Sequence, residues 1–285
     1  MTNRNYPSDL SEIDSWSQAQ QVSTEQARIR FMGFVILNCI AANRITRSGM
    51  VLKGGNALRF AYQSPRSTKD LDFTADTDGI PDNEDGIRRL LDESLAFAEG
   101  RFNVKAKCQR VKRNPRRPEA TRPTYDVGIG YQLPGDRYFH DFQNRQVSTV
   151  IPVEITLNDL VCGTQAWADI AGLRVCSLED ILAEKLRSLL QQKPRNRNRW
   201  QDAYDICTYA RRAKFDKERV ASFLVQKSSI REIDVRKSSF DEEVRKRASF
   251  DYDIHVQTEA PKHIIPFDDA WEAVISLVNS LDIPT

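Results

Sequence analysis

Two carboxylates, Asp70 and Asp72, stand two positions apart, shortly after the segment Lys53-Gly54-Gly55. On a β-strand, residues two apart leave the same face, so both carboxylates would point in one direction. Neighbouring carboxylates repel each other unless a cation lies between them or one is protonated. Oxygen ligands of this kind suit Mg²⁺, which proteins often bind through one or two carboxylates together with substrate phosphates. The pair therefore predicts a divalent-metal site, and the alternative is two solvated aspartates at the end of a strand.

The glycines Gly54 and Gly55 follow a short apolar run, 50–52, that is typical of a β-strand. Glycines at this point permit a tight turn and the close approach of another group. If a helix begins just after them, its free N–H groups attract an anion such as phosphate. Gly-Gly alone is an ordinary strand–helix turn, but the two carboxylates that follow it favour a functional site.

Three further features carry charge in unusual places. Glu154 interrupts the most apolar run, 151–157, and is either a third metal ligand on a neighbouring strand or a carboxylate on an exposed strand face. Lys185 lies in the middle of an expected helix near its apolar side, where the ordinary interpretation is a surface lysine whose amine reaches water. Asp202 and Asp205 are three apart and share a helical face, although acidic residues at a helix start are also favoured by the helix dipole.

The elements that must position these residues change in character along the chain. Short apolar or alternating runs predict strands over 50–52, 70–73, 104–112, 125–133 and 147–157. Periodicity and capping signals predict helices that begin near 23, 57, 86, 177, 200, 217 and 268. Residues 228–257 are charge-rich and poorly periodic, which indicates a solvated helix or a partly mobile segment. The order predicts an α+β fold, with a mixed sheet domain and flanking helices over 1–165 and a helical C-terminal domain over 166–285.

Composition excludes several classes of protein. The chain of 285 residues is long enough for one large domain or two ordinary ones, and its net charge of +2 points to no particular partner. Five cysteines, an odd number without paired short spacing, indicate reduced thiols and a cytoplasmic location. The three histidines are scattered, so neither a zinc cluster nor a Ser/His/Asp triad is expected. The N-terminus is unlike a secretory signal, and no apolar run is long enough to span a membrane.

Positive charge is concentrated in two segments. Between 101 and 122 the only acid is Glu119, and the prolines at 115, 118 and 123 indicate an extended loop. The basic residues of this segment include Lys105, Lys107, Arg110, Lys112, Arg113, Arg116 and Arg117. A second cluster contains Arg187, Lys193, Arg195, Arg197 and Arg199. Such segments attract phosphate backbones, so we expect an RNA partner, with solvated surface loops as the alternative.

Four motifs in this order resemble the AbiEii-type nucleotidyltransferase toxins of the DNA polymerase beta-like superfamily. Residues 52–58, Leu-Lys-Gly-Gly-Asn-Ala-Leu, are similar to the family's Lys-Gly-Gly-Thr-x-Leu, with Asn56 where Thr or Ser is usual. Residues 66–72, Arg-Ser-Thr-Lys-Asp-Leu-Asp, resemble its Arg-x-Ser/Thr-x-Asp-Ile/Leu-Asp. Residues 182–186 match its helical lysine motif, and 199–206 resemble its late Arg-Asp-x-x-Asp pattern with an insertion after the arginine.

The resemblance implies an N-terminal nucleotidyltransferase domain, a helical C-terminal domain and an active-site cleft between them. It implies that Asp70 and Asp72 hold Mg²⁺, with Glu154 carried over more weakly as a further ligand. It also implies that Asp202 acts in catalysis, by positioning or deprotonating the attacking hydroxyl. It implies that Lys185 contacts the phosphates and belongs to the catalytic set. The residues expected to bind the NTP are Lys53, Gly54, Gly55, Arg66, Ser67 and Lys185.

Members of this family act as toxins of toxin–antitoxin systems, and some add nucleotides to the 3′ end of tRNA. The resemblance therefore implies a Mg²⁺-dependent transfer from NTP to an RNA acceptor, with tRNA expected, and a cognate antitoxin protein as a partner. Two alternatives stay open. One is nucleotidyl transfer to a protein or small-molecule hydroxyl, and the other is an inactive relative that binds nucleotide or RNA.

Overall fold

A computed structural model describes residues 4–117 and 119–285 of the chain. Contacts within the chain group its residues into two units, which we treat separately. The sheet unit contains the residues up to Gln63 together with Thr68–Asp159 and Thr164–Val175. The helical unit contains Ser64–Ser67, Leu160–Gly163 and Cys176–Thr285.

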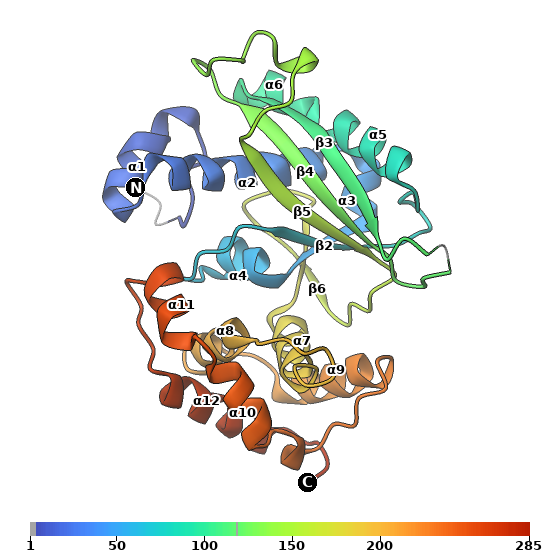
Figure 1. Ribbon diagram of the computed structural model, residues 1–285, viewed down its shortest axis with the longest axis vertical. Helices are drawn as coiled ribbons and strands as arrows, with labels where there is room; N and C mark the ends of the chain where they lie inside the picture. The colour runs from blue at the N-terminus through green and yellow to red at the C-terminus, as the bar shows by residue number, and fades with distance from the viewer. Residues whose placement is uncertain (1–3, 118) are drawn as a thin grey trace. The chain divides into compact units, whose positions relative to one another are not determined.

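The sheet unit is built on one seven-stranded mixed sheet with the order β3-β4-β5-β2-β1-β7-β6 (Figure 1). The strands are β1 (Met50–Lys53), β2 (Leu71–Ala75), β3 (Lys105–Asn114), β4 (Thr124–Gln132), β5 (Val150–Leu157), β6 (Thr164–Ala166) and β7 (Arg174–Cys176). Strands β3, β4 and β5 pair antiparallel, as do β1 and β2, whereas β2 pairs parallel with β5 and β1 parallel with β7. The parallel pairs place strands that are far apart in the sequence next to each other.

Alternation along the strands gives the sheet one apolar and one polar face. Val111, Val127, Val153 and Leu71 are opposite one another on successive strands, and all are buried. Burial of such side chains is the main favourable term for this unit. Helices α2 (Thr24–Ala42) and α5 (Glu84–Leu95) lie on one side of β3–β5 in Figure 1.

The helices of the sheet unit begin where the chain supplies capping groups. The Ser23 hydroxyl accepts a hydrogen bond from the Gln26 N–H at 3.1 Å, as the expected helix start at residue 23 requires. The Asn83 side chain caps α5 in the same way. The remaining helices of this unit are η1 (Leu10–Glu12), α1 (Ile13–Gln20), α3 (Arg44–Gly49), α4 (Gly54–Tyr62), α6 (Phe97–Phe102) and η2 (Phe142–Asn144).

The helical unit is arranged around α8 (Trp200–Ala210), which packs against α7, α10, α11 and α12. Its residues Ala203, Tyr204, Ile206 and Cys207 are fully buried. The other helices of the unit are α7 (Leu178–Leu190), α9 (Lys217–Ser229), η3 (Lys237–Ser239), α10 (Glu242–Ser249), α11 (Tyr252–Glu259) and α12 (Phe267–Ser280).

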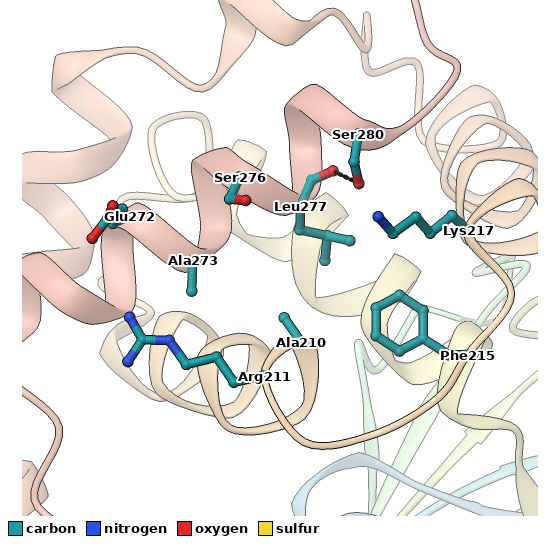
Figure 2. Close-up of a pocket in the computed structure, with 9 residues that line it drawn as sticks. All are labelled: Ala210, Arg211, Phe215, Lys217, Glu272, Ala273, Ser276, Leu277 and Ser280. Carbon is teal, nitrogen blue, oxygen red and sulfur yellow. Dashed lines mark hydrogen bonds between the residues drawn. The ribbon is translucent and has the colours of Figure 1, made fainter.

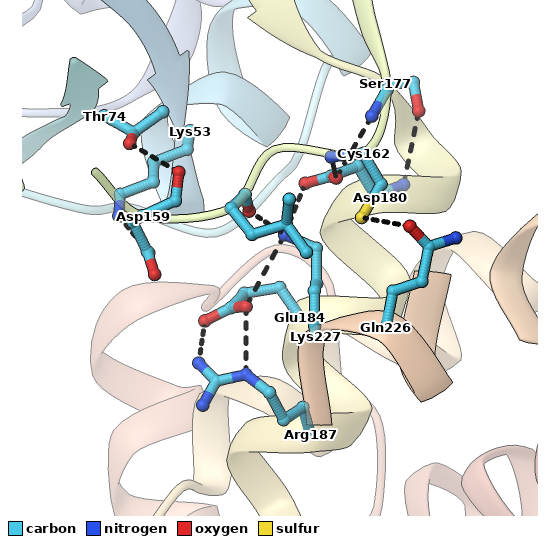
Figure 3. Close-up of polar contacts among 12 residues, drawn as sticks. Lys53, Thr74, Asp159, Cys162, Ser177, Asp180, Glu184, Arg187, Gln226 and Lys227 are labelled. Carbon is cyan, nitrogen blue, oxygen red and sulfur yellow. Dashed lines mark hydrogen bonds and ion pairs between the residues drawn. The ribbon is translucent and has the colours of Figure 1, made fainter. Parts of the chain in front are cut away.

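A buried ion pair fixes the segment Leu160–Gly163 within the helical unit (Figure 3). Lys227 Nζ lies 3.0 Å from Asp180 Oδ2 and donates to the Leu160 carbonyl at 2.8 Å. The other Asp180 oxygen accepts from the Cys162 N–H at 2.6 Å. Burial lowers the pKa of Lys227, but the carboxylates of Glu184 and Asp180 raise it by more, so the ammonium stays charged.

The α+β fold class is confirmed, and several element bounds differ from those expected. Strand β2 begins at Leu71, so Asp70 lies just before it. Strands β6 and β7 were not expected, because each has only three residues, too few to show a period. The boundary expected between 165 and 166 stays a prediction, although β7 pairs with β1 and thus extends the sheet unit beyond it.

The charge-rich stretch 228–257 contains the end of α9, η3, α10 and most of α11. Val244, Ala248, Tyr252 and Val256 bury their side chains there. These four residues recur every four positions, but the two short helices divide the repeat between them, and the many charged residues obscure it. Of the two alternatives, the structure shows helices here, and partial mobility stays a prediction.

All five cysteines are free thiols. Among the described residues, no helix is both long enough and apolar enough to cross a membrane.

The Lys227 ion pair gives a stability prediction for the helical unit. Replacing Lys227 with Met should lower the free energy of unfolding by about 3–5 kcal/mol, because Asp180 would be left buried without its cation. Urea unfolding followed by circular dichroism measures the change. The matched control is Arg236→Met, since Arg236 and Asp234 form a pair in which both side chains are more than half exposed. Equal unfolding midpoints for the two variants would contradict the prediction.

Candidate functional site

A row of charged residues crosses the polar face of the sheet on five neighbouring strands. Asp126 is opposite Glu154, Glu154 is opposite Asp72, and the two ends of the row are Lys112 and Lys53. Residues directly opposite on paired strands have their Cβ atoms about 4.5–5.5 Å apart, and like charges at this distance repel. Three carboxylates side by side therefore favour a cation next to them. This row is called the carboxylate row below.

Glycine is required where β1 meets α4. Gly54 has a φ of +68°, in the left-handed region that favours glycine. A Cβ at this position would overlap the carboxylate of Asp72, so the backbone approaches Asp72 as closely as any residue could. Gly54 and Gly55 are the first two residues of α4, whose first N–H groups have no partner within the helix. The expected helix started at Ala57, and its true start brings the glycines into the first turn.

Asn56 positions the backbone at Asp70. Its side-chain amide donates to the Asp70 carbonyl oxygen at 2.7 Å, and Asn56 is buried. The Asp70 side chain is exposed. Partial burial of its carboxyl group raises its pKa, and the positive charge of Lys69 reduces this shift. Asn56, which departs from the family pattern, thus orders the chain directly before β2.

A groove of about 260 Å³ opens over this part of the sheet unit. Asp70, Asp126 and Glu154 line it, together with the cations Arg110 and Lys112. Asp126 was not expected from the sequence. Its signal was the same as that of Glu154, a lone carboxylate in an apolar alternating strand. Asp126 is held by a hydrogen bond from the Asn114 amide.

The donor set suits a hard divalent cation. Carboxylate oxygens on adjacent strands next to free helix N–H groups match Mg²⁺ bound by one or two carboxylates with substrate phosphates. Within residues 4–117 and 119–285, however, no three acidic, His or Cys side chains converge as a ready-made metal cluster. The assignment of Asp70, Asp72 and Glu154 as metal ligands stays a prediction.

Lys53, expected to bind nucleotide, forms an ion pair with Asp159 in which Nζ and Oδ2 are 3.0 Å apart (Figure 3). Both side chains are largely buried. At the β1 end of the carboxylate row, Lys53 is thus shared with Asp159, and a phosphate contact from Lys53 stays a prediction.

In the helical unit, Lys185 is buried between two carboxylates. Its Nζ lies 2.8 Å from Asp202 Oδ1 and 2.8 Å from Asp205 Oδ2. The alternative of a surface lysine is therefore wrong, because the side chain is only 8% exposed. Burial lowers the pKa of Lys185, and the carboxylates of Asp202 and Asp205 raise it by more, so the amine stays protonated.

Arg66 completes this cluster. Its guanidinium makes two parallel hydrogen bonds to Asp205, at 3.0 and 2.9 Å, and a third to Glu259 at 3.1 Å. Burial raises the pKa of Asp205, but Arg66 and Lys185 lower it by more, so the carboxylate stays ionised. The Ser67 N–H donates to the Glu259 carbonyl at 2.7 Å. Arg66 and Ser67 thus have structural partners, and their contact with nucleotide stays a prediction.

One atom of the cluster has no donor. Asp202 Oδ2 is buried and accepts no hydrogen bond in the described part of the chain, and Arg199 Nε lies 3.9 Å away. A buried carboxylate oxygen without a donor is costly. A hydroxyl group of a bound substrate could donate a hydrogen bond to this oxygen. Asp205, by contrast, is saturated by Arg66 and Lys185.

A second hollow, of about 270 Å³, lies in the helical unit between the end of α8 and α12 (Figure 2). Arg211, Phe215, Lys217 and Glu272 are among its lining residues, and the expected site residues are not. Its lining lacks paired carboxylates, so it offers no comparable chemistry.

Two crystal structures from Helicobacter pylori resemble the chain. One, of a candidate nucleotidyltransferase, has 16% sequence identity and a TM-score of 0.52, with 90% of this chain and 95% of that chain covered. The other, JHP933, has 15% identity and a TM-score of 0.43, with 90% and 91% covered. Among curated proteins, no sequence matches the chain. The first of the two structures shows that the fold is of the nucleotidyltransferase type.

Residues 35–274, most of the chain, match the family model described as nucleotidyl transferase AbiEii toxin, type IV toxin–antitoxin system. The matched region includes all four motifs and the whole carboxylate row. The chain therefore belongs to the AbiEii nucleotidyl transferase toxin family.

Proposed function

We propose that this protein transfers a nucleotide from an NTP to an RNA acceptor in a Mg²⁺-dependent reaction, with the 3′ end of tRNA as the expected acceptor. The observation that carries the proposal is the carboxylate row beside the glycine-opened helix α4. It combines ligands for a divalent cation with N–H groups for a phosphate in a family of nucleotidyl transferases.

The sheet unit would bind the NTP. The N–H groups at the start of α4 attract the phosphate anion, and the absence of a side chain at Gly54 makes room for the Asp72 carboxylate beside them. Asp70 and Asp72 would hold Mg²⁺, with Glu154 as a further ligand. When bound, the ion supplies Lewis-acid stabilisation of the transferring phosphoryl group.

Asp202 would receive the proton of the attacking hydroxyl or hold that hydroxyl in place. Its Oδ1 is fixed by Lys185, and its Oδ2 is the buried oxygen without a donor. Fixing one oxygen and leaving the other open is the arrangement that a positioning or basic carboxylate needs. The positive charge of Lys185 would also offset charge on the phosphates.

An RNA acceptor is supported by uncompensated positive charge. Arg195 and Arg197 are exposed, and burial together with neighbouring arginines lowers the pKa of Arg195. Burial is the largest single cause of this shift, and the neighbouring arginines add a local positive potential. The second basic cluster is weaker than its sequence suggests, because Arg187 pairs with Glu184 and Lys193 with Glu243.

The family also defines the setting of the reaction. A type IV toxin–antitoxin family implies an antitoxin partner. NTPs and tRNA occur together in the cytoplasm, and we place the reaction there.

The function is tested by incubating purified protein with each labelled NTP, Mg²⁺ and total RNA. We expect label in the RNA fraction and an equal amount of released pyrophosphate. Label on protein, or pyrophosphate release without RNA, would favour the alternative acceptors. Mg²⁺-dependent NTP binding without any release would indicate an inactive relative.

Loss of the metal-binding carboxylates should abolish turnover but not folding. Asp70→Asn and Asp72→Asn should each lower turnover by about two to three orders of magnitude, because stabilisation of the transferring phosphoryl group is lost. Pyrophosphate release measures this, and thermal melting checks the fold. Asp78→Asn, at an exposed position just after β2, is the matched control. Wild-type activity in either variant would refute the metal assignment.

Asp202 and Asp205 should separate catalysis from stability. Asp202→Asn should lower kcat by about 10²–10⁴ and leave KM unchanged, because a base or orienting acceptor is lost. Asp205→Asn should instead cost about 3–5 kcal/mol of unfolding free energy, since Arg66 and Lys185 would lose their shared carboxylate. Steady-state kinetics and urea unfolding on both variants distinguish the two roles. If Asp202→Asn lowers stability without lowering kcat in the folded fraction, Asp202 is structural.

A further inference from the structure

We propose that Arg110 and Lys112 on β3 form a binding site for the phosphates of the RNA acceptor strand. This inference deepens the proposed function and rests on it. It assigns the two cations to the acceptor and not to the NTP.

Both cations lie on the polar face of the sheet, beside the carboxylates. Lys112 is opposite Asp126, and Arg110 is opposite Gly128. A Cβ at Gly128 would lie 3.6 Å from the Cβ of Arg110, so the arginine stem runs along a strand position that has no side chain of its own. Both cations line the groove that also contains Asp70 and Glu154.

The neighbouring cations of the same strand are occupied elsewhere. Lys105 pairs with Glu99, and Lys107 donates to the Gln143 carbonyl. Arg113 pairs with Asp82 and donates to two loop carbonyls. The side chains of Arg110 and Lys112 are exposed and make no hydrogen bond or ion pair with the described residues. The sequence showed only a basic segment. In the structure, Arg110 and Lys112 are the cations of β3 that remain available to a ligand.

The distance across the sheet separates this pair from the triphosphate site. Gly54 follows β1, whereas Arg110 and Lys112 are on β3, and the strand order places β2, β5 and β4 between them. Four spacings of about 4.8 Å put the two ends roughly 19 Å apart, farther than a triphosphate extends. A triphosphate held at the start of α4 therefore does not reach the β3 end, and we assign this end to a second anion.

The spacing along β3 suits a polymer of phosphates. Residues two apart on a strand are separated by about 6.8 Å, similar to the spacing of consecutive phosphates in an extended nucleic acid strand. Arg and Lys are the side chains that neutralise such phosphates. An RNA strand lying along β3 would pass directly beside the carboxylates where its end would react.

The test is the double variant Arg110→Gln/Lys112→Gln, measured with a 12-nucleotide single-stranded RNA and with bulk tRNA, without NTP. Binding is titrated over a range of salt concentrations. The slope of log K against log[salt] should fall in magnitude by about 1.4 for the oligonucleotide, because each neutralised phosphate of a single strand contributes about 0.7. Affinity for a non-hydrolysable NTP with Mg²⁺ should not change.

The matched control is Arg44→Gln/Arg89→Gln, which removes the same charge from exposed positions on α3 and α5. It should leave the salt dependence at the wild-type value. An unchanged slope in the Arg110/Lys112 variant overturns the proposal, as does a wild-type protein that binds neither RNA. Loss of NTP affinity with unchanged RNA binding also overturns it, because the pair would then serve the triphosphate.

The same experiment distinguishes failure of the transfer reaction from failure of the phosphate site. If wild type transfers no label to RNA while the double variant still loses RNA affinity and salt dependence, the phosphate site stands and the transfer reaction does not. Because binding is measured without NTP, turnover cannot influence the result.

Discussion

The sheet unit must hold carboxylates on adjacent strands close together against their electrostatic repulsion. Asp126, Glu154 and Asp72 are neighbours in register, and register in a sheet cannot slip by one residue without moving every apolar side chain to the wrong face. The buried residues between them, such as Val153 and Ile155, thus hold three like charges together. Hydrophobic burial supplies the free energy, and the unfavourable charge is kept where a cation and phosphates can offset it.

In the helical unit, unlike in the sheet unit, buried carboxylates are paired with cations of the protein itself. Its buried carboxylates have their cations built in, with Asp205 between Arg66 and Lys185 and Asp180 beside Lys227. Such networks are stable only when nearly every polar atom has a partner. Asp202 differs, because its Oδ2 is buried and accepts no hydrogen bond from the described residues. The contrast separates residues that maintain the structure from one whose bonding is incomplete.

The sequence was sufficient for the features that repeat or that bring residues close along the chain. Alternation placed Glu154 on the polar face, and the Ser23 cap located the start of α2. Features created by pairing between distant strands could not be inferred. The alignment of Asp126 with Glu154 depends on β4–β5 register, and the partners of Lys185 depend on how α7 packs on α8. The surface-lysine alternative for Lys185 stayed open because helical periodicity reveals a face but not what covers it. The short strands β6 and β7 were missed because three residues are too few to show a period.

The contact between Gly54 and Asp72 has an evolutionary consequence. Position 54 accepts no atom beyond hydrogen, in a backbone conformation that other residues rarely adopt. A change of Gly54 to an uncharged residue such as Ala, Val or Ser would displace Asp72 without altering any charge. Substitutions of this kind would impair the carboxylate row as much as a change of Asp72 itself, although they leave every acidic residue in place.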